Sequence, residues 1–266
     1  MRKALFNGSF YPYSKEEIEE LLQKFFEGKK KKGNVVAIVA PHAGYEYSGK
    51  VAAFSYAQLK DFEGTAVIVG PNHTGFGSLV AVSMQDWETP LGVVETNKEL
   101  AKAIIKNSKF ARENELAHSQ EHSIEVQLPF LQYVAKSFKI VAIAMLDQSL
   151  EKAKDLAQAI IKAEKETKEK IVLIASSDFN HYESAEVAKK KDEKVINEIL
   201  KLDEEAFYEK IEEEEDSACG YAPIACSILF AKEKKAKALL LNYSNSGEAT
   251  GDFDSVVAYC SIGFFV

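Results

Sequence analysis

Three of the five histidines follow short apolar runs of the kind that form buried strands. VVAIV leads into APHAGYEYSG with His42, TAVIVG leads into GPNHTGFG with His73, and IVLIAS leads into SDFNHY with Asp178 and His181. Ligands of open α/β sheets bind beyond the carboxyl ends of the strands. We therefore expect these four side chains to meet at one sheet edge, where imidazole and carboxylate groups could bind a metal ion or transfer protons.

The loops that carry His42 and His73 have the composition of rigid binding loops. Glycines follow both histidines, in HAGY and HTGFG, and glycine lets the backbone turn sharply and approach a ligand closely. Pro41 and Pro71 stiffen the entry to each loop. A single histidine after a strand is more often a loop residue bonded to backbone, but three in one context favour a preorganised site.

The other two histidines, His118 and His122, lie in LAHSQEHSIEVQLPFL with i, i+4 spacing. HSQEH matches the H-x-x-E-H pattern of inverted zinc metallopeptidases, although so short a pattern arises easily by chance. The apolar periodicity instead predicts a helix over His122–Val134. We expect His122 to contact a metal ligand as a hydrogen-bond donor rather than to bind the metal itself.

The three cysteines are too few for a disulfide framework, so each is a packing residue or a ligand. Cys226 and Cys260 lie in apolar segments, where a thiol behaves as a small hydrophobic group. Cys219 lies in SACGYAP, before a helix whose expected first residue is Pro223. A helix N-terminus favours the thiolate that a metal or an electrophile needs, and an ordinary loop thiol is the alternative.

Strands that alternate with helices must position these residues. Strands are predicted at Val35–Val39 and Thr65–Gly70 and in runs that begin at Leu79, Leu91, Phe138, Lys170, Ala238 and Val256. Helices are predicted from Ser14 to Gly28, near Ser48, and over Lys98–Asn107, His122–Val134, Leu150–Thr167, Ala185–Leu200 and Pro223–Lys234. Short connections and the lack of a linker predict one α/β domain over residues 1–266, with a central, mostly parallel or mixed sheet flanked by helices.

The composition narrows the function classes. With 266 residues, 46% of them hydrophobic, the chain can fill one core, and a net charge of −8 argues against nucleic acid as the main partner. The acidic run Glu212–Asp216 is expected to be a solvated turn. We find no signal peptide or membrane-spanning run and expect a soluble, cytoplasmic protein. The abundance of Lys and Glu is typical of thermostable proteins.

Five motifs appear in the order seen in the Memo family: APHAGYEYSG, GPNHTGFG, EHSIEVQLPFL, SSDFNHY and ACGYAP. The sequence resembles Memo proteins over most of its length. Memo proteins are in turn similar in fold to the LigB-type subunit of class III extradiol dioxygenases, which open catechol rings with non-haem Fe(II). The resemblance therefore implies a LigB-like fold with a metal-binding pocket.

The resemblance also implies roles for individual residues. His42, His73 and Cys219 are the implied metal ligands, and Cys219 occupies the place where the dioxygenases have a glutamate. His181 resembles the acid/base histidine, and Asp178 resembles a pocket carboxylate that orients a ligand or a metal-bound water. A thiolate is softer than a carboxylate, widens the choice of metal to Fe(II), Cu or Zn and alters the redox potential of the metal. Memo-family proteins are associated with iron or copper and with redox activity, so the resemblance implies Fe(II) or Cu in preference to Zn, and redox activity in preference to strict ring cleavage.

Three function classes are compatible with this pattern. The first, which we favour, is a metal-dependent redox protein, with oxygenase activity as one form. In this class Tyr45 contacts the substrate. Because prokaryotic Memo proteins are linked with radical-SAM and AMMECR1-type proteins, the resemblance implies such proteins as partners. The second is a module that binds a peptide or small molecule without catalysis, with aromatic anchors at Tyr11, Tyr13, Tyr45, Tyr47 and Trp87. The third is a zinc hydrolase that uses His181 or Asp178 as a base.

Overall fold

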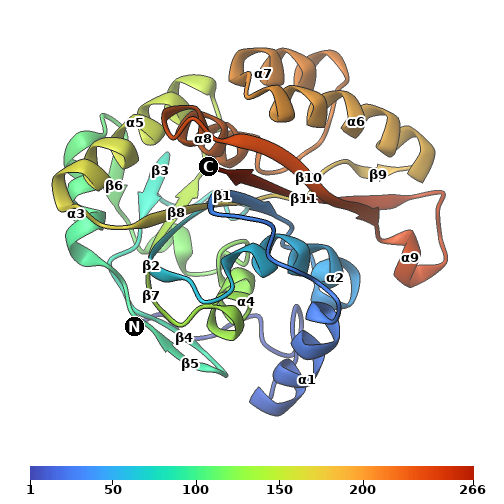
Figure 1. Ribbon diagram of the computed structural model, residues 1–266, viewed down its shortest axis with the longest axis horizontal. Helices are drawn as coiled ribbons and strands as arrows, with labels where there is room; N and C mark the ends of the chain where they lie inside the picture. Colours follow the sequence, from blue (N-terminus) through green and yellow to red (C-terminus); the bar gives the residue numbers. More distant parts are fainter.

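A nine-stranded mixed sheet forms the centre of the computed structural model, which describes residues 1–266 (Figure 1). Its strands are β1 Val35–Ala40, β2 Glu63–Pro71, β3 Val80–Val82, β6 Ala111–Glu113, β7 Ser137–Met145, β8 Ile171–Ser176, β9 His181–Glu183, β10 Lys237–Asn245 and β11 Val256–Phe265. They follow the order β10-β11-β1-β8-β2-β7-β3-β6, and β9 pairs with β11. The four strands β1, β8, β2 and β7 are parallel, whereas β11 is antiparallel to β1 and β3 is antiparallel to β7.

The central parallel strands are buried on both faces. Every residue of β8 is buried, and so are the last four residues of β1 and the last seven of β2. Strands covered on both faces require continuous apolar runs instead of alternation, which is why VVAIV and IVLIAS form them. Ile174 of β8 pairs with Ile38 of β1 on one side and with Ile68 of β2 on the other, so the carboxyl ends of the three strands lie at one edge.

Helices cover both faces of the sheet. They are α1 Lys15–Phe26, α2 Tyr45–Tyr56, α3 Lys98–Asn107, α4 Leu128–Val134, α5 Leu150–Thr167, α6 Ala185–Lys201, α7 Glu204–Glu213, α8 Tyr221–Glu233 and α9 Gly247–Thr250. One hydrophobic core includes residues of α3, α5, α6, α7 and α8, and the other includes residues of α1, α2 and α4. None of the helices has both the length and the apolar character needed to cross a membrane.

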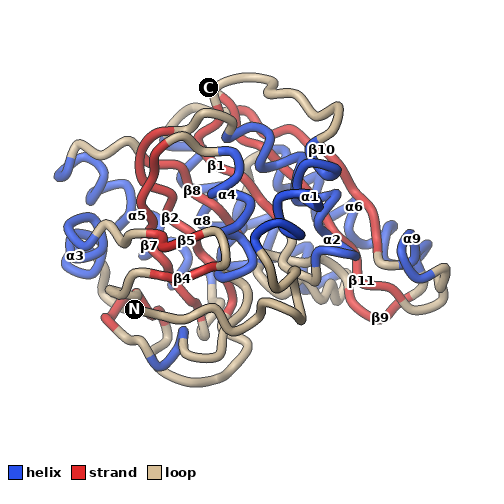
Figure 2. The backbone as a smooth tube through the Cα atoms, turned by 90° about the horizontal axis from the view of Figure 1, so that it is seen from below, coloured by secondary structure: helices blue, strands red, loops and turns tan.

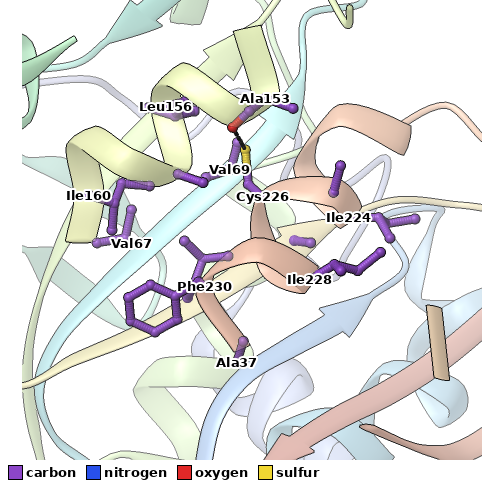
Figure 3. Packing of buried hydrophobic residues seen from close by; sticks show 14 of the residues in the cluster. Ala37, Val67, Val69, Ala153, Leu156, Ile160, Ile224, Cys226, Ile228 and Phe230 are labelled. Carbon is purple, nitrogen blue, oxygen red and sulfur yellow. Dashed lines mark hydrogen bonds between the residues drawn. The ribbon is translucent and has the colours of Figure 1, made fainter. Parts of the chain in front are cut away.

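The first of these cores holds two of the three cysteines. Figure 3 shows Cys226 of α8 between Val69 of β2 and Ala153 and Leu156 of α5. Its thiol donates to the carbonyl oxygen of Ala153 at 3.4 Å, and Cys260 on β11 is equally buried. Both cysteines are packing residues, as the sequence predicts, and Cys219 is left as the cysteine available to a site.

The N-terminal segment crosses the edge of the molecule beside a small hairpin made of β4 Trp87–Thr89 and β5 Gly92–Val94 (Figure 2). The amide of Arg2 donates to the Asp86 carbonyl, and the carbonyl of Arg2 accepts from the Glu88 amide, each at 2.8 Å. The start of the chain is therefore fixed to the hairpin before it reaches α1.

The predicted α/β domain is confirmed, and most predicted elements differ from the observed ones only at their ends. The helix predicted over His122–Val134 is wrong in its first half: a 3-10 turn at Glu125–Gln127 precedes α4, and α4 begins at Leu128. Pro129 stands in the first turn of α4, where its missing N–H costs nothing. The acidic run Glu212–Asp216 is a turn only in part, because its first two residues end α7, a helix that the sequence analysis missed.

Candidate metal centre

The carboxyl ends of β1, β8 and β2 each carry one of the predicted side chains. His42 follows β1, Asp178 follows β8 and His73 follows β2, in each case two residues beyond the strand. Because β8 lies between β1 and β2 in a parallel arrangement, these residues share one edge of the sheet. The structure therefore brings together His42, His73 and Asp178.

His122 joins His42 and His73 in a cluster of three imidazoles. One ring nitrogen from each lies within 4.8 Å of the others, and the ring centroids are 5.1 Å (His42–His73), 5.3 Å (His42–His122) and 4.6 Å (His73–His122) apart. His122 comes from a loop that is tied to the end of β2, since the Ser123 hydroxyl donates to the Pro71 carbonyl at 3.0 Å. From the sequence, His122 is expected only to support a metal ligand, whereas in the structure its ring has the same access to a shared ion as the rings of His42 and His73.

Hydrogen bonds around Ser176 fix the tautomer of His42. Oγ of Ser176 donates to the Ser123 carbonyl at 2.7 Å and accepts from Nε2 of Gln127 at 2.9 Å. Because the only hydroxyl proton is used, Nδ1 of His42, 2.9 Å from Oγ, must be the donor in that contact. Nε2 of His42 therefore keeps the lone pair that a metal ion needs.

Glu121 holds His73 in a similar way. Its carboxylate accepts from the His73 amide at 2.5 Å and lies 2.9 Å from Nδ1 of that ring. Burial would raise the pKa of Glu121, but the hydrogen bond and charge of His73, with the Ser123 amide, outweigh it and lower the pKa to about 2. The ionised carboxylate thus holds Nδ1–H and leaves Nε2 of His73 free. This role of Glu121 was not predicted, although the residue stands in the HSQEH string and in the EHSIEVQLPFL motif beside His122.

Burial keeps the rings of His42 and His122 neutral. The pKa of His42 lies well below its usual value, first because the ring is buried and then because His73 is close. Burial and the neighbouring His42 lower the pKa of His122 to about 3, against the opposing charge of Glu121. Both rings are therefore unprotonated near neutral pH, which is the state that binds metal.

The thiol of Cys219 adjoins this cluster. Its Sγ lies 3.1 Å from Nε2 of His42, but it is outside the group of atoms that all lie within 4.8 Å of one another. The amide of Cys219 donates to the Asp178 carbonyl at 3.2 Å, which ties its loop to the end of β8. Although part of the residue surface is accessible, burial of the thiol, with the nearby Asp178 charge, raises the pKa of Cys219 above its usual range. The thiol is therefore protonated unless a metal displaces the proton.

Asp178 serves the loop of His42. Its Oδ1 accepts from the amides of His42 and Ala43 at 2.8 and 3.3 Å, and its Oδ2 lies 3.9 Å from Nε2 of His42. Burial raises the pKa of Asp178 in spite of these amide bonds. The carboxyl group fixes the backbone that carries His42 and reaches the edge of the cluster.

His181 and Tyr45 have different surroundings from each other. Nδ1 of His181 lies 3.1 Å from the Ser217 carbonyl, so it is the donor, and Nε2 makes no hydrogen bond within the protein. Tyr45, in contrast, is 2% exposed, and its hydroxyl donates to the Val126 carbonyl at 2.7 Å. The expected contact of Tyr45 with substrate does not fit this placement, because the first turn of α2 directs that ring into the core.

The comparisons with known proteins agree with the motif pattern. A family model described as Memo-like protein matches residues 2–263. The chain belongs to the Memo-like family. A MEMO1 family protein of Archaeoglobus fulgidus is 45% identical over 266 residues, and the match covers 100% of both chains. MEMO1 family proteins of Methanosarcina acetivorans and Nitrosopumilus maritimus are 44% and 42% identical over 266 and 275 residues, with 98% and 99% of both chains covered.

In this Memo-like chain the three imidazoles line a cleft of about 640 Å³. Asp178, His181 and several aromatic side chains also line it: Phe10, Tyr47, Tyr182 and Tyr259. A larger depression of about 950 Å³ lies at the amino ends of the strands, and its lining contains no histidine or cysteine. The smaller cleft is therefore the candidate site.

The aromatic residues proposed as peptide anchors are divided between the surface and the core. Tyr11 and Trp87, like Tyr45, are buried, so they cannot contact a peptide. Tyr13 and Tyr47 are exposed, and of these two only Tyr47 lines the cleft. Tyr182, which the sequence analysis missed, is 79% exposed and has a φ of 64°, a left-handed conformation that costs a non-glycine residue free energy.

Proposed function

We propose that this protein is a metal-dependent redox protein that binds Fe(II) or Cu through His42, His73 and Cys219, with His122 as a further ligand. The observation that carries the proposal is the meeting of three imidazoles with ring nitrogens within 4.8 Å of one another, with the Cys219 thiol 3.1 Å from the first of them. Imidazole ligands suit iron, copper and zinc, and a thiolate is also compatible with all three, so the choice of iron or copper rests on the family resemblance.

The residues fit such an ion in three respects. The rings of His42 and His122 are neutral, and Nε2 of both His42 and His73 is left free by a partner on Nδ1. The supports of those Nδ1 atoms, Ser176 and Glu121, are buried and hydrogen-bonded themselves, as the outer partners of metal-binding histidines usually are. The cleft leaves room for a second molecule beside the cluster.

Bound iron or copper would supply one-electron chemistry and Lewis acidity at the base of the cleft. His181 would hold or accept a proton from a bound molecule through Nε2, since Nδ1 is directed to the Ser217 carbonyl. Asp178 would keep the His42 loop in place through the two amides it accepts. On the resemblance to extradiol dioxygenases we propose oxygenase-type activity as the first reaction to test, and radical-SAM and AMMECR1-type proteins as partners.

A zinc hydrolase is the second candidate, because three histidines around an open position form a common catalytic zinc site. Here His181 or Asp178, which both line the cleft, would act as the base. The metal separates the candidates: zinc cannot change its oxidation state, whereas iron and copper do.

The test is elemental analysis of protein purified without oxygen. We expect close to one Fe or Cu per chain in the wild type, and loss of that metal in His73→Ala and in Cys219→Ala. Cys226→Ala is the matched control, because it removes a buried thiol from the core and should leave the metal content unchanged. Full metal in both site variants would contradict the proposal, and zinc in place of iron or copper would favour the hydrolase.

A further inference from the structure

The loop that carries Glu121 and His122 is not held by regular secondary structure. It connects the 3-10 turn Leu116–His118 to the turn Glu125–Gln127, and no helix or strand includes residues 119–124. Nevertheless this loop supplies one imidazole of the cluster and the carboxylate that orients another. Groups outside the loop must therefore fix its position.

Arg2 bonds to this loop and to the turn on each side of it. Its Nε donates to the His118 carbonyl at 2.7 Å, its Nη2 to the Glu121 carbonyl at 2.8 Å and its Nη1 to the Glu125 carboxylate at 2.5 Å. The residue is only 7% exposed, and its guanidinium lies 4.2 Å from the centroid of the Trp87 ring. Because the backbone of Arg2 is bonded to the β4–β5 hairpin, the loop is fixed to a rigid part of the fold.

Glu125 completes the arrangement from the other side. It is fully buried and accepts hydrogen bonds from Arg2, from the amides of Leu5 and Phe6 and from the hydroxyl of Tyr11. A buried carboxylate is stable only when such partners compensate its charge. Glu125 thus ties residues 2–11 to the end of the loop.

The same N-terminal segment touches His122 directly. The centroids of the Phe10 and Phe6 rings lie 4.6 and 5.7 Å from the centroid of the His122 ring. These two aromatic rings, and the His73 ring stacked at 4.6 Å, restrict the rotation of this imidazole.

We propose that Arg2 is a positioning residue of the metal centre, which holds Glu121 and His122 where the ion binds. The inference rests on the proposed metal binding. A lysine in its place would keep the charge, but a single ammonium on a flexible stem cannot reproduce the rigid fork that bonds to His118, Glu121 and Glu125 together. The geometry of the centre should therefore depend on the guanidinium, more than 100 residues away in sequence.

The test is a Co(II) titration of the metal-free protein, followed by its visible absorption spectrum. We expect Arg2→Lys and Glu125→Gln to weaken Co(II) binding by about 10-fold or more, as loss of an outer partner of a metal ligand does. At saturating Co(II), both variants should show shifted absorption bands, which a variant that only lowers the stability of the fold would not show. Lys3→Ala is the matched control: this neighbouring lysine bonds to Glu88 on the surface, and its loss should change neither quantity.

The outcomes separate the two proposals. A wild type that binds no Co(II) would overturn the metal centre and with it the role of Arg2. Co(II) binding by both variants with wild-type affinity and wild-type spectrum would overturn the role of Arg2 alone. Circular dichroism at the titration temperature checks that each variant is folded. If Arg2→Lys does not fold, Glu125→Gln, which keeps the shape of the side chain, still tests the proposal.

Discussion

Sγ of Cys219 lies 3.1 Å from Nε2 of His42, and Nε2 can only accept a proton, because Nδ1 is the donor to Ser176. The thiol proton of the metal-free protein therefore points at the nitrogen that would bind the metal. An ion that binds both atoms must displace this proton.

Metal binding should release a proton that comes from Cys219. Burial raises the pKa of this thiol, so it is protonated at pH 7 in the absence of metal, whereas the lowered pKa values of His42 and His122 leave no proton to displace there. Calorimetric titration with metal in buffers of different ionisation enthalpy measures the number of protons released per bound ion. We expect about one released proton in the wild type, and about one fewer in Cys219→Ala, which lacks the thiol. Equal proton release by both proteins would show that the thiol does not bind the ion.

Glu121→Gln should weaken metal binding by about 10-fold to 100-fold. The amide cannot provide the negative charge that holds Nδ1–H of His73. Its NH₂ group would also face a donor in either orientation: the His73 amide in one, the Ser123 amide and Nδ1–H of His73 in the other. Isothermal titration with metal measures the change. Glu113→Gln, an exposed carboxylate on β6, is the control, and a Glu121→Gln affinity that matches this control would contradict the assigned role.

Gly220→Ala should disturb the Cys219 loop. A Cβ at this position would lie 2.4 Å from the Ser176 carbonyl oxygen and 2.7 Å from Cβ of Ser177, both at the end of β8. The loop must then move away from the sheet edge, and we expect a lower melting temperature and weaker metal binding. Gly33→Ala is the comparison, because its nearest contact would be a flexible ring at 3.4 Å. Wild-type metal affinity in Gly220→Ala would contradict the close packing of this loop.

A buried carboxyl pair lies on the other side of the same loop. Asp192 of α6 is fully buried, accepts from the Tyr243 hydroxyl at 2.5 Å and contacts the carboxyl group of Asp216, three residues before Cys219. Burial, and then the charge of Asp216, raise the pKa of Asp192 to about 9. Asp192 therefore keeps its proton at neutral pH.

Stability should fall as pH rises because of this pair. An aspartate in the unfolded chain ionises near pH 4, so between about pH 4 and pH 9 Asp192 holds a proton in the folded protein that it has lost in the unfolded protein. The contribution of Asp192 to the free energy of unfolding therefore decreases as pH rises. Asp192→Asn keeps the shape and a donor towards Asp216 and removes the titration. Urea unfolding at pH 5 and pH 9 measures the free energy of unfolding. The decrease in this free energy between the two pH values should be smaller in Asp192→Asn than in the wild type, by at least about 1.4 kcal/mol, the equivalent of one pKa unit. Asp254→Asn, at an exposed position, is the control and should lose as much unfolding free energy between pH 5 and pH 9 as the wild type. An equal loss in Asp192→Asn and Asp254→Asn would contradict the raised pKa of Asp192.

The sequence could predict those residues of the metal centre that directly follow strands. His42, His73 and Asp178 follow buried apolar runs, and the meeting of the ends of parallel strands is a property of the fold class. That these residues share one edge of the sheet could be predicted from the sequence. The strand order, in which β8 lies between β1 and β2, is known only from the structure.

The roles of His122, Glu121 and Arg2 could not be predicted, because they depend on contacts between residues more than 45 positions apart. The loop around His122 has a sequence with helical periodicity, but the bonds from Arg2 and to Pro71 hold it in an irregular path with turns. Tyr45 shows the opposite failure: its position next to a binding loop suggested a site residue, but α2 begins at this residue and turns its ring inward.

X-ray absorption spectroscopy of the metal in protein purified without oxygen tests the central claim most directly. We expect an iron or copper ion with imidazole nitrogen neighbours and one sulfur neighbour. The sulfur contribution should vanish in Cys219→Ala, and the imidazole contribution should fall in His122→Ala. A metal shell made only of oxygen atoms, or a spectrum that neither substitution changes, would contradict metal binding by these residues.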